Sequence, residues 1–387
     1  MKHKYHKGLI NGMASLISIV MGLVFGFALL LIFNPRYALP GFGNLMSAGF
    51  TSSEKLAKVF YQSAPLLMTG LSVAFAFKTG LFNIGATGQY TLGAFFSLVA
   101  VVQFRLPWWA GILLAMVGGA VMGFIPGVCK ALFNVNEVIT SIMFNWISLF
   151  VVNLSINNMP LLLANAWGAI NKDRTAALTS PKFVAYNPNA TIPKAGLDQL
   201  LGSNYMNIAV FIAILIALII WLVMNRTTFG YELKACGYNR FASDYAGINA
   251  KRNIILSMTI AGALAGIGGG LYYLSGTAQY TIVKSLLAMG FNGIPVALLA
   301  SSNPLGTIFS ALFISFIQVG GDLLQPEYSR EIIDIIISVI IYLSAFALLM
   351  RGWISKLLMR NQTENVNEEL DDSSASDDAA ESEESAK

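Results

Sequence analysis

The chain has 387 residues, of which 56% are hydrophobic and only 11% are charged. Soluble domains usually carry about a quarter charged residues, so this composition excludes an ordinary soluble protein. Apolar runs of roughly 17–25 residues recur along the chain, and runs of this length cross a bilayer as helices. The sequence therefore predicts an all-α, polytopic integral membrane protein.

The charge is divided unevenly between the body of the chain and its C-terminal end. Ten of the 20 acidic residues and only one basic residue, Lys387, lie in 361–387. Residues 1–360 then hold 23 basic and 10 acidic residues, a formal charge of +13. A segment rich in Ser, Ala, Asp and Glu is typical of disorder. We therefore expect a membrane domain over 1–360 and a disordered, solubilising tail over 361–387.

About ten membrane spans are expected, and an even number places both termini on one side of the membrane. The first apolar run is too long for a signal peptide and is kept as a span. Short connections on the N-terminal side carry most of the basic residues, which indicates the cytoplasm. We therefore expect both termini and the stretch 225–252 inside, and the long loop 155–204 outside. The predicted spans are 9–33, 62–77, 84–104, 108–133, 138–154, 205–224, 253–274, 285–302, 304–320 and 331–350.

The sequence lacks the patterns of an enzyme. No G-x-x-x-x-G-K-[ST] phosphate-binding loop occurs, and no metal-ligand cluster or Ser/His/Asp set stands out. Cys129 and Cys236 are too far apart for a metal motif, and both fall on the predicted cytoplasmic side, where disulfides are rare. We expect no catalytic residue, metal or cofactor in this chain. If it belongs to a pump, another subunit handles the ATP.

Two interrupted apolar segments carry polar side chains. The segment 82–89 reads Phe-Asn-Ile-Gly-Ala-Thr-Gly-Gln, and 290–295 reads Gly-Phe-Asn-Gly-Ile-Pro. Non-helical backbone within a membrane must line a cavity or pack against protein, and paired interruptions indicate a transporter's solute path. Helix packing and capping at the glycines remains the alternative. The polar candidates for the path are Asn83, Thr87, Gln89, Asn145 and Asn292.

The stretch 225–252 is a charged segment between two long apolar runs. Gly237 permits a break in the chain, and Asn239 can cap a short helix after it. Phe241, Tyr245 and Ile248 recur at helical spacing. From the residues alone, this stretch is either the place where a partner outside the membrane binds or a solvated loop at the membrane interface, and the two interpretations are equally supported.

Four stretches resemble the permease subunits of bacterial ABC importers. They are 64–95 (APLLMTGLSVAFAFKTGLFNIGATGQYTLGAF), 134–147 (NVNEVITSIMFNWI), 233–248 (LKACGYNRFASDYAGI) and 290–306 (GFNGIPVALLASSNPLG). The branch is the branched-chain amino acid, ribose and simple-sugar type, and the likeness is closest to its nucleoside-uptake permeases. The acidic tail lies outside the family pattern.

The resemblance implies a complex. Its expected partners are a second homologous permease subunit, a cytoplasmic ABC ATPase that binds ATP, an extracellular substrate-binding lipoprotein and membrane lipid, with no nucleic acid. Within 237–248 the resemblance implies a coupling region that fits a groove on the ATPase. The residues carried over are Gly237, Asn239, Arg240, Phe241, Asp244, Tyr245, Gly247 and Ile248.

The leading hypothesis is an ATP-driven importer permease for nucleosides in the cell membrane. Phe82, Trp146 and Phe291 could then stack on a planar base, since aromatic stacking tolerates many bases. A simple-sugar permease of the same branch is the near alternative. An ion-coupled secondary transporter is disfavoured because a proton relay needs several buried acids along the helices.

Overall fold

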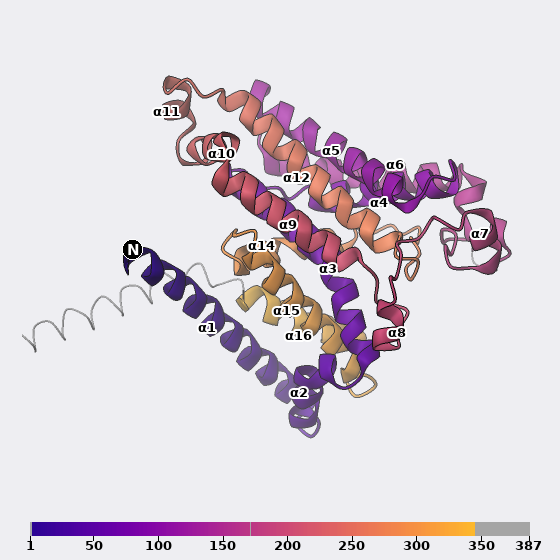
Figure 1. Ribbon diagram of the computed structural model, residues 1–387. Helices are drawn as coiled ribbons and strands as arrows, with labels where there is room; N and C mark the ends of the chain where they lie inside the picture. The colour runs from indigo at the N-terminus through magenta and orange to yellow at the C-terminus, as the bar shows by residue number, and fades with distance from the viewer. Residues whose placement is uncertain (1, 171, 345–387) are drawn as a thin grey trace, which may run out of the picture.

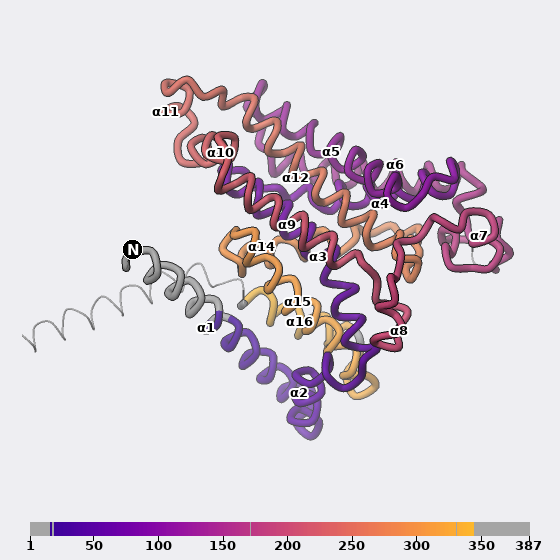
Figure 2. Tube along the Cα trace, in the orientation of Figure 1, coloured from indigo at the N-terminus to yellow at the C-terminus, as the bar shows by residue number. Residues whose placement is uncertain are grey.

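The computed structural model describes residues 2–170 and 172–344, and they form helices joined by short irregular segments. Within this part of the chain the only extended pairing is two isolated bridges, Leu163 with Thr175 and Arg174 with Thr281. The prediction of an all-α protein is therefore confirmed. The tail 361–387 and the last residues of the tenth predicted span lie outside the described residues. Figures 1 and 2 show the path of the chain.

Six of the described helical segments are long and apolar enough to cross a membrane. They are α3 (Ser53–Lys78), α5 (Trp108–Phe133), α6 (Glu137–Asn157), α9 (Ala209–Arg226), α12 (Ala250–Tyr273) and the segment Gly306–Leu324, which begins with α15 (Gly306–Gly321). Shorter apolar helical segments lie at Ile19–Phe33 in α1 (Lys2–Phe33), in α4 (Ala86–Val102) and at Ala288–Leu299. The helix α16 (Arg330–Ser344) closes the described chain. The prediction of a polytopic membrane protein is confirmed, whereas the number of ten spans stays a prediction.

The predicted span 285–302 is interrupted within 290–295, as the sequence indicated. This region holds two short helices, α13 (Ala288–Phe291) and α14 (Gly293–Leu299), which meet at Asn292. A Cβ atom on Gly290 would overlap the backbone of Thr87, and one on Gly293 would lie 2.6 Å from the carbonyl carbon of Thr69. The break therefore lets the chain pack tightly against α3 and α4, which a local hydropathy pattern does not reveal.

The centre of the fold is α12, which packs against α3, α4 and α5. Gly119 of α5 and Gly266 of α12 face each other so closely that a Cβ atom on Gly119 would lie 2.7 Å from the α carbon of Gly266. Small residues allow such close helix packing where hydrophobic burial between helices gains little. The glycine-rich part of α12 thus packs closely against α5.

A second group of helices lies beside this centre. It contains α1, α2 (Ala38–Ser47) and α16, with α15 linking it to α3. Its buried side chains include Leu30, Leu45 and Ile336, which form an apolar cluster of their own. In Figure 1 these helices lie below the layer of α5, α6 and α12.

The predicted loop 155–204 is folded and carries α7 (Pro181–Tyr186) and α8 (Leu197–Leu201). Trp167 packs edge-on against Phe183 and Tyr186, each with ring centroids 4.9 Å apart. The Asn187 side chain donates hydrogen bonds to the carbonyl oxygens of Val101 (2.9 Å) and Leu106 (3.0 Å). The loop thus covers the end of the bundle opposite to α10 (Thr228–Tyr238) and α11 (Arg240–Tyr245), as Figure 2 shows.

Candidate functional site

The segment between α9 and α12 forms two short helices that project from one end of the bundle (Figure 1). Asn239 ends α10 and begins α11, and its Oδ1 accepts a hydrogen bond of 3.0 Å from the Ala242 N–H. The predicted cap at Asn239 is therefore confirmed. Gly247 follows with a φ of +81°, which ends the helical path. Ile248 consequently lies after α11, so helical spacing relates only Phe241 and Tyr245.

Gly237 does not make the break between the helices. It lies inside α10, and the break falls at Asn239. A Cβ atom on Gly237 would overlap the carbonyl oxygen of Lys78 and lie 3.0 Å from the carbonyl carbon of Thr79. The prediction of a break at Gly237 is therefore wrong, and the missing side chain instead lets α10 touch the end of α3.

Four large aromatic side chains on the two helices are strongly exposed. Tyr238 and Tyr245 are 91% and 95% exposed, Phe241 is 76% exposed and Tyr231 is 69% exposed. We call these four residues the aromatic face. Aromatic side chains gathered on a surface are typical of protein–protein interfaces. Tyr231 and Tyr238 were absent from the sequence prediction, although the spacing of seven between 231, 238 and 245 was visible in the sequence.

The two charged residues of α11 fix it to the bundle. Arg240 donates a hydrogen bond of 3.3 Å from Nη2 to the carbonyl oxygen of Ala131, near the end of α5. Asp244 accepts one of 3.2 Å at Oδ1 from the Ala250 N–H, at the start of α12. These contacts hold the aromatic face in a defined position relative to the membrane helices.

Three of the predicted path residues meet in a buried cluster of amides. Asn83 and Gln89 bind each other reciprocally, with Nδ2 to Oε1 at 2.8 Å and Nε2 to Oδ1 at 3.0 Å. Asn145 accepts from the Gly88 N–H at 2.8 Å and donates to the Ile84 carbonyl oxygen at 3.0 Å. The two Asn145 bonds satisfy backbone groups in the turn before α4 and in the first turn of α4, where unpaired groups are costly. We call Asn83, Gln89 and Asn145 the amide cluster.

Four other predicted path residues are buried or half-buried. Thr87 is fully buried, and its hydroxyl has no hydrogen-bond partner among the described residues. Phe82 is half-buried and stacks on Phe77 with ring centroids 5.0 Å apart. Phe291 and Asn292 are half-buried at the junction of α13 and α14.

Trp146 points elsewhere, although it follows Asn145 directly. It is 40% exposed and stacks on Phe150 with ring centroids 5.9 Å apart. Successive residues of a helix point about 100° apart, so Asn145 faces α4 while Trp146 lies on the outer surface of α6. The structure therefore does not bring Trp146 together with the amide cluster.

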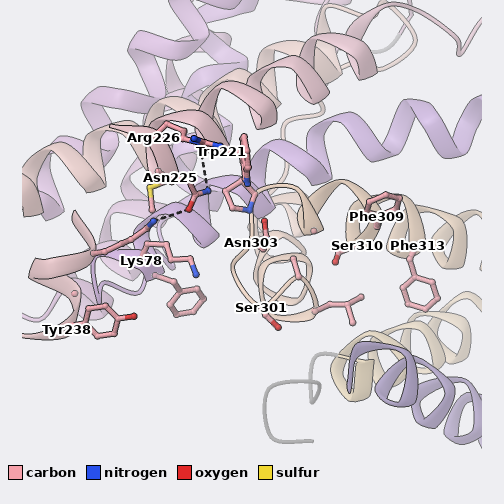
Figure 3. A pocket seen from close by; sticks show the side chains of 18 of the residues that line it. Lys78, Trp221, Asn225, Arg226, Tyr238, Ser301, Asn303, Phe309, Ser310 and Phe313 are labelled. Atoms are coloured by element: carbon pink, nitrogen blue, oxygen red, sulfur yellow. Dashed lines mark hydrogen bonds between the residues drawn. The ribbon is translucent and has the colours of Figure 1, made fainter. Parts of the chain in front are cut away.

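A cavity of about 1330 Å³ opens beside α10 at the end of the bundle that we expect to face the cytoplasm. Its walls come from the ends of α3 and α9, from α10, and from the turn 299–306 and α15, and we call it the inner cavity (Figure 3). Lys234 donates a 3.0 Å hydrogen bond to Asn225, whose Nδ2 donates to the Trp221 carbonyl oxygen at 3.0 Å. The sequence does not predict this cavity, because its lining residues come from helices far apart in the chain.

A second, smaller cavity of about 590 Å³ lies at the opposite end of the bundle. Its lining is mostly polar and includes Glu54, Lys194 and Tyr205. Lys194 donates a 2.7 Å hydrogen bond to Asn204, and the Tyr205 ring lies 5.7 Å from that of Tyr61. We call it the outer cavity.

A comparison with known families decides the class of the chain. The family described as branched-chain amino acid transport system / permease component matches residues 55–345. The chain belongs to this family. The predicted resemblance is confirmed, and with six candidate spans the permease is a multi-pass protein of the cell membrane.

Individual relatives of the permease match over most of their length. The nucleoside ABC transporter permease protein NupB of Lactococcus lactis is 34% identical over 351 residues, covering 88% of this chain and 92% of the relative. The guanosine ABC transporter permease protein NupP of Bacillus subtilis is 34% identical over 358 residues, covering 91% and 98%. A second guanosine permease of that organism, NupQ, is 26% identical over 269 residues, covering 66% and 78%. No solved structure matches the chain.

Proposed function

We propose that this chain is the transmembrane permease subunit of an ATP-driven ABC importer for nucleosides. The names of NupB and NupP support the substrate class, since the similarity spans nearly the full length of both relatives. NupP and NupQ are two different permeases from one organism, which favours a pair of unlike permeases around a shared path. ATP is hydrolysed by a separate ATPase, and a lipoprotein receptor delivers the nucleoside from outside.

The contact of Gly237 with the end of α3 carries this proposal. The aromatic face offers a surface for the ATPase, and Arg240 and Asp244 attach it to α5 and α12. Gly237 adds a backbone contact to α3, the most buried of the six candidate spans. Packed helices move as rigid bodies, so a displacement of α10 and α11 by the ATPase passes directly into the central helices.

The solute path follows from the two interruptions in the helices. In the described conformation the amide cluster is bonded to protein, and Gly290 seals Thr87 beneath α13. Movement of α13 and α14 away from α4 would uncover Thr87 and the amides of Asn83, Gln89 and Asn145. Asn292 would then face the same space, and Phe82 and Phe291 would offer rings to the base. Trp146, on the outer surface of α6, would contact the second permease or lipid instead.

The outer cavity supports delivery from the opposite side. Its polar lining lies between the folded loop 155–204 and the start of α3, at the end remote from α10 and α11. A receptor docked on this loop would release its nucleoside next to Tyr205 and the hydrogen-bonding groups of Ser203 and Asn204. The loop thus serves as the docking surface for the receptor.

The function is tested by uptake into proteoliposomes that contain this chain, the second permease and the ATPase, with the receptor added outside. Radiolabelled uridine should enter only with ATP inside, and unlabelled guanosine should compete while ribose should not. Competition by ribose at equal concentration would favour the simple-sugar alternative. Uptake that persists without ATP and collapses with an ion gradient would overturn the ABC assignment.

A further inference from the structure

The inner cavity collects positive charge from three helices. Lys78 is the last residue of α3, Arg226 is the last residue of α9, and Lys234 lies in α10. None of the described residues that line the cavity is acidic. A cleft lined by positive charges attracts anionic groups more strongly than a flat surface with the same charges does.

The opposite wall of the cavity carries two aromatic rings. Phe309 and Phe313 lie one turn apart on α15, and Phe309 is 74% exposed. Figure 3 shows both rings on α15, away from Arg226 and Asn225 at the end of α9. The candidate spans α3 and α9 end at the cavity, so its cations lie at the expected surface of the membrane. Phe309 and Phe313 lie farther along the candidate span that begins with α15, on the side of the membrane interior. This order matches a phospholipid, with a charged headgroup next to acyl chains.

The polar wall is held in place by its own contacts. Asn225 is fixed by its bond to the Trp221 carbonyl oxygen and in turn holds the Lys234 ammonium at 3.0 Å. Arg226 follows Asn225 directly at the end of α9, so it lines the same cavity as Lys234. A phosphate can accept hydrogen bonds from both groups, and such charge-assisted bonds are the stronger ones.

We propose that the inner cavity binds an anionic phospholipid of the inner leaflet. Its phosphate lies against Arg226 and Lys234, and its acyl chains follow Phe309 and Phe313. The acidic tail 361–387 is a poorer occupant, because its only large apolar residues are Val366 and Leu370 and the aromatic wall would stay uncovered. The lipid site does not depend on the transported substrate, so it stands apart from the proposed function.

The test compares lipid retention by the full-length chain with that of two matched double variants. The chain is purified from nanodiscs containing phosphatidylcholine with or without phosphatidylglycerol, and bound lipid is counted by native mass spectrometry. Arg226→Gln with Lys234→Gln removes two cations of the cavity, whereas Lys251→Gln with Arg252→Gln removes two exposed cations of α12 outside it. Each cation of the cavity should contribute about fivefold in affinity for phosphatidylglycerol. The cavity variant should therefore bind this lipid about 25-fold more weakly, and the α12 variant like the unchanged chain.

A control for folding is thermal melting in phosphatidylcholine alone, where the unchanged chain and both double variants should melt at the same temperature. Phosphatidylglycerol should raise the melting temperature of the unchanged chain and of the α12 variant but not of the cavity variant, because a bound ligand stabilises the folded state. An equal loss of affinity for phosphatidylglycerol in both double variants would show that the lipid responds to surface charge in general, and it would overturn the proposal. Displacement of the lipid by inorganic phosphate, or its loss when the second permease is co-purified, would also overturn it.

Discussion

Gly237 of α10 lies directly against the carbonyl oxygen of Lys78, the last residue of α3. The two residues are far apart in the sequence, yet the space between them cannot hold a methyl group. This contact joins the segment that carries the aromatic face to the most buried candidate span. It gives the proposed ATPase a direct backbone contact to α3, which packs against α12 and α14.

Gly237→Ala should separate ATP hydrolysis from transport. The added Cβ overlaps backbone atoms that cannot rotate away, so α10 must shift, at a cost typical of overpacking of about 1–3 kcal/mol. We expect uridine uptake by the reconstituted complex to fall about tenfold or more, while the ATPase still binds. Gly43→Ala is the control, because a Cβ atom on Gly43 meets nothing within 4 Å. Normal uptake by the Gly237 variant would remove this contact from the mechanism.

Truncation of the aromatic face should weaken binding of the ATPase. Aromatic anchors in an interface typically contribute about 2 kcal/mol when truncated, which is about thirtyfold in affinity. Phe241→Ala and Tyr245→Ala should each show such a loss in a co-purification titration, with the melting temperature unchanged because both side chains are exposed. Leu200→Ala, an exposed apolar residue of α8 at the opposite end, should leave the affinity as it was. An unchanged affinity for both aromatic variants would place the ATPase contact elsewhere.

Helix ends and caps could be predicted from the sequence, because they depend on residues close together in the chain. The span 108–133 was predicted with its observed bounds, since Pro107 precedes α5 and Asn134, with a φ of +52°, ends it. Asn239 was predicted as a cap because the chemistry of a cap lies within three residues. The interruption at 290–295 was also predicted, and it falls at Asn292. The close packing at this interruption and the inner cavity were not predictable in this way. Both depend on residues distant in the chain, such as Gly290 against Thr87.

Removal of Asn145 from the amide cluster should destabilise the chain. Asn145→Leu would leave the buried Gly88 N–H and Ile84 carbonyl oxygen without these partners, and each such group costs about 1–3 kcal/mol. We expect a clear drop in melting temperature in detergent. By contrast, Asn83→Leu with Gln89→Leu should cost less than the sum of the two single changes, because each side chain is the other's partner. Additive effects in that pair would show that the reciprocal bonds contribute little.

Gly290→Ala tests whether α13 seals the solute path. The new Cβ would lie 2.6 Å from the backbone nitrogen of Thr87 and 2.5 Å from its hydroxyl oxygen, so α13 must move off the start of α4. If this movement uncovers the amide cluster, uridine should cross proteoliposomes without ATP, at a rate above that of the unchanged complex. Gly43→Ala again serves as the control, since its surroundings are open. A Gly290 variant that is destabilised but does not leak would show that the contact is structural and that the path lies away from Thr87. A variant that leaks uridine but excludes a larger solute of similar polarity would place the path at this contact.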